Sequence, residues 1–553
     1  MRWLRKLLSG KAKNEAAELA NDRLDISQRE AIERRLPLER SLEDNLDAIR
    51  TVVGPSKDLM IRQLKVGQGQ IGTAVLHLEG LSDSSLVENI IRTLGLGTFQ
   101  TPVGSASKRD IFDEFKQRLL QSSEGREVNT LDEVWDGLVN GNSAVIFDGT
   151  PKALICATQG FKTRAIEEPS AETVIRGPRE GFIESISTNI ALLRRRIKSP
   201  NLWVESFILG HLTRTDVAIA YIKGLASEEL VQEVRQRVSR IQIDGIIESG
   251  DIENFIEDNP FAVSPLVFRT ERVDRAVSML LEGRVCIVTD GTPFVLVVPM
   301  SLPMLLQAPD DYYEKLPIGA FLRVLRHVAF TSSILLPGTY VAVLEFHQEL
   351  LPTQLLLRIT AAKEGVPFPV VSEVFMMELL FELLREAGIR LPRAIGPAVT
   401  IVGALVLGEA AIRAGLVSAP VVIIVALTAI ASFTVPTFSF GIAARLTRFI
   451  FIILGGTFGL FGVQFGILVL VLLLASLRSF GYPFLSPMAP LVVRDLKDLY
   501  CRAWRWYMDT RPLLEGAREP VRQAKGQMPR PGIEKEETEK PGRGIGGKWR
   551  RRR

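Results

Sequence analysis

Three glutamates at helical spacing are the residues of this sequence best placed to act on ions. Glu378, Glu382 and Glu386 follow one another at intervals of four within the amphipathic stretch 372–386, so a helix there puts them on one face. A carboxylate at mid-bilayer costs about 2.5 kcal/mol or more, and it must meet water, a cation or a basic partner. Glu378 and Glu382 are therefore a candidate ion path, unless the helix lies flat at the membrane interface. Arg385, three residues after Glu382, is a competing partner for that carboxylate.

Two further groups of charges could bind partners. Glu409 and Arg413 are four residues apart between two apolar runs, and pairing would lower the free energy needed to bury both in a membrane. Arg194, Arg195 and Arg196 follow one another in a basic segment. Three interpretations of this triplet stay open: contact with acidic lipid head groups or an acidic partner, a solvated helix face, or buried ion pairs made by one or two of its members.

Patterns for enzymatic chemistry are not found in the sequence. The four histidines lack metal-ligand spacing, and none lies in a recognisable nucleophile turn. Residues 67–72 fit GxGxxG, but they precede a strand instead of following one and opening a helix. The three cysteines are far apart and are expected to be reduced thiols. We expect no enzyme, no cofactor and no metal site, and the net charge of +4 is too small to indicate a nucleic-acid partner.

Long apolar runs in the second half of the chain predict an integral membrane protein. A soluble helix needs a polar face, and the run 449–477 has none apart from Gln464. Crossing a hydrocarbon core takes about 20 apolar residues, so this run is either one strongly tilted span or two short helices broken near 462–466. The first span is expected over residues 322–344, with a kink at Pro337.

Basic residues next to the apolar runs predict the orientation. The positive-inside rule places Arg323, Arg326 and the basic C-terminal tail on the cytoplasmic side, together with the N-terminal half. Both ends on one side require an even number of spans. Four spans leave Arg445 and Arg448 outside, whereas six bring them inside but require the helix over 372–386 to cross and the last run to split. Both numbers stay open.

The first half of the chain contains an internal duplication. Gly-Leu turns at Gly80 and Gly224 lie 144 residues apart, and Asp-Gly-Thr-Pro turns beginning at Asp148 and Asp290 lie 142 apart. Each is embedded in a matching pattern of strands and helices, which predicts two related α/β subdomains. Asp and Gly are residues that a tight hairpin turn demands, so we interpret the tetrapeptide as a turn and not as a catalytic motif.

The predicted fold class is an α/β cytoplasmic region of two related subdomains, followed by an all-α polytopic membrane domain. The expected divisions are an N-terminal helical arm over 1–44, α/β subdomains over 45–165 and 170–303, a membrane domain of four to six helices over 317–490, a cytoplasmic helix over 491–516, and a disordered basic tail over 517–553.

A resemblance to a known family rests on one long membrane block and several shorter stretches: residues 175–202, 283–299, 301–315, 349–369, 377–436 and 477–485. Over about residues 40–490 the chain resembles the A subunits of spore germinant receptors, the GerA family. The paralogous AF-type proteins of sporulation stage V share this architecture. The Asp-Gly-Thr-Pro-Phe turn and the Arg-Leu-Pro-Arg-Ala-Ile-Gly block are more similar to the receptor branch.

The resemblance implies a multi-pass protein of the endospore inner membrane. Its implied partners are a transporter-like B subunit that holds the nutrient, a lipoprotein C subunit, membrane lipid, and further copies of the chain in a ring, for example a pentamer. The implied activity is a nutrient-gated ion channel that releases monovalent cations early in germination. A non-conducting receptor scaffold is the alternative. A transporter is less favoured, because no repeat is found within the membrane part.

Overall fold

The computed structural model describes residues 36–66, 71–96, 112, 116, 125–160, 169, 172–391 and 408–529 of the chain. Most of the predicted N-terminal arm lies outside these ranges. The part of the arm that is described does not stand apart, because helix α3 (Leu42–Val53) already covers the first sheet with buried Leu46 and Ile49. The first subdomain therefore begins a few residues before the predicted boundary.

The first subdomain is a five-stranded antiparallel sheet with helices packed on it. Its strands lie in the order β1-β2-β4-β5-β3. After α3, the elements in chain order are β1 (Leu59–Val66), β2 (Ile71–Leu78), α4 (Ser84–Leu96), β3 (Gly125–Val128), α6 (Leu131–Val139), β4 (Ser143–Phe147) and β5 (Ala153–Cys156).

The second subdomain has the same topology, with strand order β6-β7-β9-β10-β8. Its elements are α7 (Ile186–Arg196), β6 (Leu202–Leu209), β7 (Thr215–Ile222), α8 (Glu228–Ser239), α9 (Ser249–Ile256), β8 (Phe268–Thr270), α10 (Val273–Leu280), β9 (Val285–Thr289) and β10 (Val295–Val298). The central strands β4 and β9 are buried on both faces, which explains their continuous apolar runs.

The two Asp-Gly-Thr-Pro turns lie at equivalent places, between β4 and β5 and between β9 and β10. The Asp148 carboxylate accepts a hydrogen bond from the Leu42 amide at 3.3 Å, and the Asp290 carboxylate accepts one from the Ile186 amide at 3.0 Å. Leu42 and Ile186 are the first residues of α3 and α7, so each aspartate caps the first helix of its own subdomain. The turn assignment holds, but this contact is long-range and not the local backbone contact expected from sequence.

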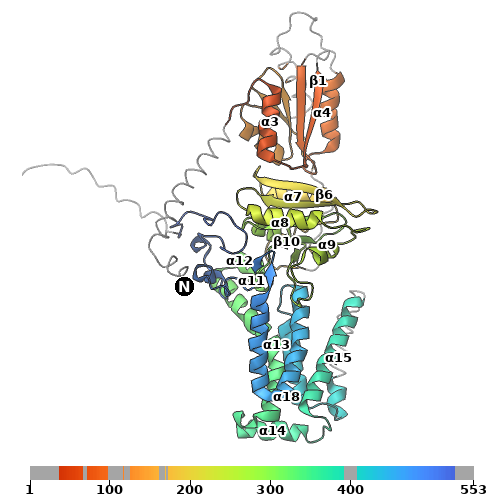
Figure 1. The fold of residues 1–553 in the computed structure, drawn as a ribbon, viewed down its shortest axis with the longest axis vertical. Coiled ribbons are helices and arrows are strands. Elements are labelled where there is room, and N and C mark those ends of the chain that lie inside the picture. The colour runs from red at the N-terminus through yellow and green to blue at the C-terminus, as the bar shows by residue number, and fades with distance from the viewer. Residues whose placement is uncertain are drawn as a thin grey trace, which may run out of the picture.

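Helices form the rest of the described chain. Short helices α11 (Leu302–Leu306) and α12 (Asp310–Tyr313) lead into α13 (Leu316–Phe346), which is followed by α14 (Thr353–Lys363), α15 (Val370–Arg390), α17 (Ala419–Ser432) and α18 (Phe438–Ser476). Within the described ranges, α13 and α18 are long and apolar enough to cross a membrane. Figure 1 shows the first subdomain, the second subdomain and the helices stacked along the long axis, with α14 at the far end.

The last apolar run is split. Gly459 has φ 62° and ψ −147°, which interrupts α18 three residues before the predicted break. A Cβ atom at Gly462 would lie 2.3 Å from the Leu454 carbonyl oxygen, so the two halves approach closely beyond the interruption. Phe440 and Leu477, near the two ends, both pack on the core of the second subdomain. The helix therefore reverses at Gly459 and returns to the sheets as a hairpin.

The other helices run between the same two ends of the bundle. The Val370 amide donates to Glu345 at 2.9 Å, so α15 begins where α13 ends, far from the sheets. The Ser418 amide donates to Glu373 at 2.7 Å, so α17 begins beside the first turn of α15. Helix α15 thus runs along the bundle and does not lie flat across one end (Figure 1). Arg448 lies in the middle of the first half of α18, so it does not flank the bundle as expected.

The predicted helix over 491–516 is wrong. Residues 493–498 and 505–507 form two 3₁₀ turns, and the rest of this C-terminal segment is irregular. Its backbone also binds the second subdomain: the Ser227 amide donates to Gly516 at 2.8 Å, and the Arg518 amide donates to Leu225 at 2.7 Å. Ala517 and Arg518 take part in this contact and Arg522 binds Glu282, which corrects the predicted start of the tail. Residues 530–553 lie outside the described chain.

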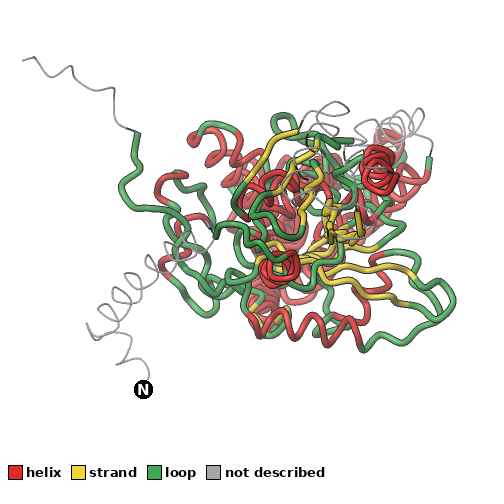
Figure 2. Tube along the Cα trace, turned by 90° about the horizontal axis from the view of Figure 1, so that it is seen from above, coloured by secondary structure: helices red, strands yellow, loops and turns green. Residues whose placement is uncertain are grey.

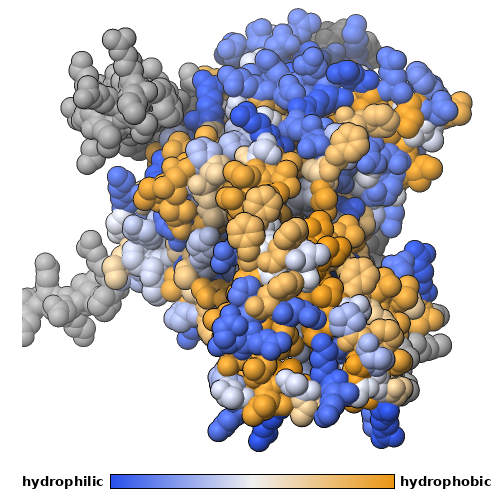
Figure 3. Space-filling model, turned by 60° about the horizontal axis from the view of Figure 1, so that its bottom comes forward, coloured by the Kyte–Doolittle hydropathy of each residue, from blue (hydrophilic) through white to orange (hydrophobic). Residues whose placement is uncertain are grey.

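The surface of the molecule changes along the long axis. In Figure 3 the α/β end is mostly hydrophilic, whereas broad hydrophobic areas cover the helices. Seen along the axis, the strands overlie the helices, so the sheets are stacked on the end of the bundle (Figure 2). Phe461, Leu472 and Ile423 are among the large apolar side chains that remain exposed on the helices, at 72%, 61% and 65%. Such a surface is suited to lipid or to other membrane helices.

Candidate functional site in the helix bundle

Glu378 is paired inside the chain. Its side chain is fully buried and accepts a hydrogen bond from Arg448 of α18, which is also fully buried. The Arg448 Nε donates to the Ser333 carbonyl of α13 at 2.7 Å. The expectation that Glu378 faces a water-filled path is therefore not what the single chain shows: of the three partners considered, Glu378 meets the basic one.

Glu382 lies one turn further along α15 and is less buried. It pairs with Arg445 of α18 at 3.2 Å and with Arg385 of its own helix at 3.8 Å. Arg385 in turn donates to the Ser432 hydroxyl at 2.9 Å, and its guanidinium lies 4.6 Å from the Phe433 ring centroid. The competing i, i+3 pair is thus present, and it is shared with a second arginine that sequence reasoning did not connect to the glutamates.

Together these five side chains form a charged layer, defined as Glu378, Glu382, Arg385, Arg445 and Arg448. Two carboxylates face three guanidinium groups, so the layer carries one excess positive charge. It connects α13, α15, α17 and α18. Removing one member of a buried pair typically costs about 3–5 kcal/mol because the other charge is left alone. Ionisable groups within membrane segments mark pathways or coupling sites more often than they serve stability.

The predicted pair Glu409–Arg413 forms. However, the two side chains are 57% and 78% exposed, so the pair is not buried within the chain. An equivalent exposed pair, Glu386–Arg390, lies on the last turns of α15 at 2.6 Å. Exposed i, i+4 pairs contribute only about 0.3–0.5 kcal/mol in water. Neither pair belongs to the charged layer.

The arginine triplet divides between two roles. Arg194 is 1% exposed and binds Asp58 of the first subdomain through two hydrogen bonds of 2.7 and 3.0 Å. Contact of Arg194 with lipid or a partner is therefore wrong, because the side chain holds the two subdomains together. Arg195 and Arg196 are about 40% exposed and pair with Glu180. For these two, contact with acidic lipid or an acidic partner stays a prediction.

A second buried network lies at the junction of the sheets and the helices, and the sequence analysis missed it. Arg323 of α13 pairs with Asp311 at 3.1 Å and with Asp498 of the C-terminal segment at 2.9 Å. Arg326 shares Asp311 at 2.9 Å. The signal for this network in the sequence is the pair Arg323 and Arg326, one turn apart in an otherwise apolar helix; the positive-inside rule interprets them only as markers of orientation.

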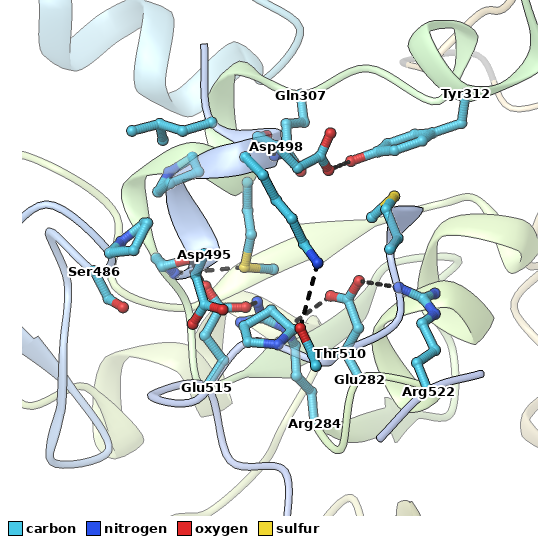
Figure 4. A pocket seen from close by; sticks show the side chains of 18 residues that line it. Glu282, Arg284, Gln307, Tyr312, Ser486, Asp495, Asp498, Thr510, Glu515 and Arg522 are labelled. Carbon is cyan, nitrogen blue, oxygen red and sulfur yellow. Dashed lines mark hydrogen bonds and ion pairs between the residues drawn. The ribbon is translucent and has the colours of Figure 1, made fainter. Parts of the chain in front are cut away.

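A small polar cavity of about 70 Å³ adjoins this junction, room for a few water molecules. Figure 4 shows Arg522 directed at Glu282, and Tyr312 directed at Asp498. Arg284 pairs with Glu515 at the same cavity. Burial raises the pKa of the Glu282 carboxyl and that of the Tyr312 hydroxyl. The arrangement joins the turn before β9, α12 and the C-terminal segment, and it suits mechanical coupling better than chemistry. Among the described residues, no three His, Cys, Asp or Glu side chains are grouped to hold a metal ion.

Comparisons with known proteins identify the family. Residues 47–514 match the family described as Bacillus/Clostridium GerA spore germination protein. Spore germination protein KA of Bacillus subtilis is 44% identical over 501 residues, which cover 90% of this chain and 91% of that protein. Spore germination protein B1 of the same organism is 35% identical and is covered completely, with 88% of this chain aligned. Stage V sporulation protein AF, also from B. subtilis, is 32% identical over 86% of this chain and 94% of its own length.

A solved structure is similar to about half of the chain. The crystal structure of the N-terminal domain of the A subunit of the Bacillus megaterium spore germinant receptor GerK3 is 33% identical, covers 48% of this chain and 96% of its own, and gives a TM-score of 0.39. The family match spans most of the residues that build the sheets, the charged layer and the junction. The chain therefore belongs to the GerA family of spore germination proteins.

Proposed function

We propose that this chain is the A subunit of a spore germinant receptor, and that several copies form a ring that acts as a nutrient-gated channel for monovalent cations. In this proposal it lies in the inner membrane of the endospore and works with a transporter-like B subunit and a lipoprotein C subunit. Two of the relatives named above are spore germination proteins, and the apolar helices α13 and α18 suit a membrane.

The observation that carries the channel is the charged layer. In the arrangement described, arginines engage both Glu378 and Glu382, and one positive charge is left over. That charge opposes the passage of cations. We infer that this is a closed arrangement, and that a shift of α18 against α15 would free carboxylates to face the ions. The experiment is reconstitution of the chain, alone and with its partner subunits, in liposomes loaded with a potassium-sensitive dye.

The variants that test the layer are Glu382→Gln and Glu386→Gln. Glu382→Gln releases Arg445 and Arg385 and should change the potassium flux severalfold, whereas Glu386→Gln alters an exposed pair of the same helix and should leave the flux unchanged. Equal flux in both variants would place the path elsewhere. Absence of flux from the wild-type assembly with all its partners, in the presence of the nutrient, would refute conduction.

The alternative is a non-conducting receptor scaffold, and the junction network favours it. Arg323 links the first membrane helix to the C-terminal segment through Asp498, so the α/β region could pass on a signal without any pore. The number of copies in mild detergent separates the two functions. A closed ring of several copies supports the channel, and a monomer supports the scaffold.

We also propose six membrane passes, with both ends cytoplasmic. The lengthwise run of α15 and the reversal of α18 at Gly459 favour six passes over four. Cys501 lies in the C-terminal segment and is exposed, whereas Cys156 and Cys286 are buried. Burial also raises the pKa of the Cys156 thiol to about 12, which makes it unreactive. A membrane-impermeant maleimide should thus label only inside-out vesicles, and Cys501→Ser should abolish the label. Labelling of right-side-out vesicles would refute this topology.

A further inference from the structure

Glu373 differs from the other glutamates of α15. Three of them have arginine partners: Glu378 pairs with Arg448, Glu382 with Arg445 and Glu386 with Arg390. Glu373 is fully buried, and the described residues provide no lysine, arginine or histidine within ion-pair distance of it. The most enclosed carboxylate of the helix outside the charged layer therefore has no counter-charge from the described chain.

The contacts of Glu373 leave half of its carboxylate free. Oε2 accepts hydrogen bonds from the amide and the hydroxyl of Ser418, at 2.7 and 2.8 Å. Oε1 is buried and has no hydrogen-bond partner among the described atoms. The hydroxyl of Tyr340 on α13 also has no hydrogen-bond partner among the described atoms, and Tyr340 packs against the cluster that contains Val370 and Val374, the neighbours of Glu373 on α15. Two unsatisfied oxygens thus belong to the place where α13, α15 and α17 meet.

The surroundings of these oxygens are apolar. Val370, Val374, Val417 and Val421 are buried around them, and Tyr340 packs against the same cluster. An ionised carboxylate in such a place loses its hydration, and the attraction of a neighbouring helix N-terminus is weaker than that loss. The free energy of the folded bundle therefore favours a positive species beside Oε1 that the polypeptide itself does not supply.

The donor set indicates which species fits. One carboxylate balances one positive charge, and the other available donors are neutral hydroxyl oxygens, which suit hard alkali ions. A divalent ion would need several further acidic ligands, and no three His, Cys, Asp or Glu side chains are grouped to hold a metal ion among the described residues. We propose that Glu373, Tyr340 and Ser418 form a binding site for one sodium or potassium ion, which joins α13, α15 and α17. The site lies apart from the charged layer, and its occupancy does not depend on conduction.

Equilibrium binding of sodium-22 and rubidium-86 to the purified full-length protein in detergent tests the site. We expect each chain to bind about one ion, either sodium-22 or rubidium-86 or both in competition. Glu373→Gln, which keeps the shape and removes the charge, should abolish binding. Glu386→Gln, the same change on an exposed residue of the same helix, should leave it intact. Tyr340→Phe removes one neutral donor and should weaken binding several-fold to tenfold.

The outcomes separate an ion from a proton. If wild-type protein binds neither isotope, or if Glu373→Gln binds as wild type does, the proposal is wrong. The temperature of thermal unfolding gives a second measurement, and it also covers a Glu373→Gln variant that fails to fold. Wild type should unfold at a higher temperature in sodium or potassium chloride than in N-methylglucamine chloride of equal ionic strength, and Tyr340→Phe should narrow that difference. Dependence on pH without dependence on the cation would show that Glu373 holds a proton, and would overturn the site.

Discussion

The two α/β subdomains have the same strand order, yet different parts of the chain complete them. In the first, the residues directly after β5 return to the Gly-Leu turn. Gln159 forms a bridge with Ser82, and the Asp83 amide donates to Thr158 at 2.7 Å. The Gly160 amide closes the contact with Leu81 at 3.4 Å. The first subdomain is thus completed by its own local sequence.

In the second subdomain the C-terminal segment takes this place. Ala517 forms the bridge with Ala226, the Ser227 amide donates to Gly516, and the Arg518 amide donates to Leu225. The chain after β10 is not free to return, because it continues into α11, α12 and α13. The second subdomain is joined to α13 by the chain that follows β10, and to the chain beyond α18 by residues 516–518. Both long apolar helices are therefore connected to the same sheet.

The largest effect is expected from a substitution that breaks the contact between the two subdomains. Asp58→Asn leaves Arg194 buried without its carboxylate, which should cost about 3–5 kcal/mol. Hydrogen exchange of the amides at this interface, for example that of Val204, which donates to Ser56 at 3.0 Å, should accelerate accordingly. Glu180→Gln is the control. It releases only the partly exposed Arg195 and Arg196 and should cost less than about 1 kcal/mol. Equal effects of the two variants would show that the copies are held together by other contacts.

The next largest effect is expected from a substitution that weakens the contact of the C-terminal segment with the second subdomain. Glu515→Gln weakens the contact with Arg284. Because Arg284 still pairs with Glu282 at 3.7 Å and still donates to the Pro299 carbonyl, we expect the free energy of unfolding to fall by a smaller amount, about 1.5–3 kcal/mol. Exchange should increase at the Ser227 and Arg518 amides. The equivalent amides of the first subdomain, Asp83 and Gly160, are the internal control and should not change. Faster exchange at both pairs would mean that the C-terminal segment stabilises the whole region and not one copy.

Some of this could be predicted from the sequence because it is local. The Gly-Leu and Asp-Gly-Thr-Pro turns and the apolar runs depend on neighbouring residues, and they correspond to turns and long helices. The pairs Glu409–Arg413 and Glu382–Arg385 form because their spacing is a property of one helix. Burial and long-range pairing are not local. Nothing near Arg194 indicates Asp58, and nothing near residues 516–518 indicates that their backbone binds the Gly-Leu turn of the second subdomain.

The charged layer shows the same limit. The sequence placed Glu378 and Glu382 on one helix face, but their partners Arg448 and Arg445 lie 70 and 63 residues away on α18. Reversal of α18 depends on the left-handed conformation of Gly459, and several glycines in that run could have adopted it. The choice is made by packing, because Gly455 and Gly338 allow the backbones of α18 and α13 to touch.

A third prediction is that the stability of the two subdomains depends on pH in opposite directions. Burial raises the pKa of Glu253 on α9 to about 7. The folded state then holds a proton that the unfolded state releases between about pH 4.5 and 7, so stability falls with rising pH through this window. Glu253→Gln should remove the fall and gain roughly 1–3 kcal/mol at pH 8. In the first subdomain, hydrogen bonds from Lys116 and Lys152 lower the pKa of Glu127. The stability that ionised Glu127 contributes is therefore lost as the pH falls. Glu127→Gln should accordingly lower the free energy of unfolding at neutral pH, whereas Glu253→Gln raises it. Unfolding followed between pH 4 and 8 checks both.

The smallest effect tests whether the copies are equivalent in detail. Asp148→Ala and Asp290→Ala each remove the acceptor for the first amide of α3 or α7, and each should cost about 1 kcal/mol. Backbone bonds from Gly149 to Arg40 and from Gly291 to Glu184 remain in both variants. The comparison therefore isolates the carboxylates. Exchange rates of the Leu42 and Ile186 amides measure each loss at its own helix. If only one aspartate matters, the duplication has kept the topology of the two sheets but not the way in which their first helices are held.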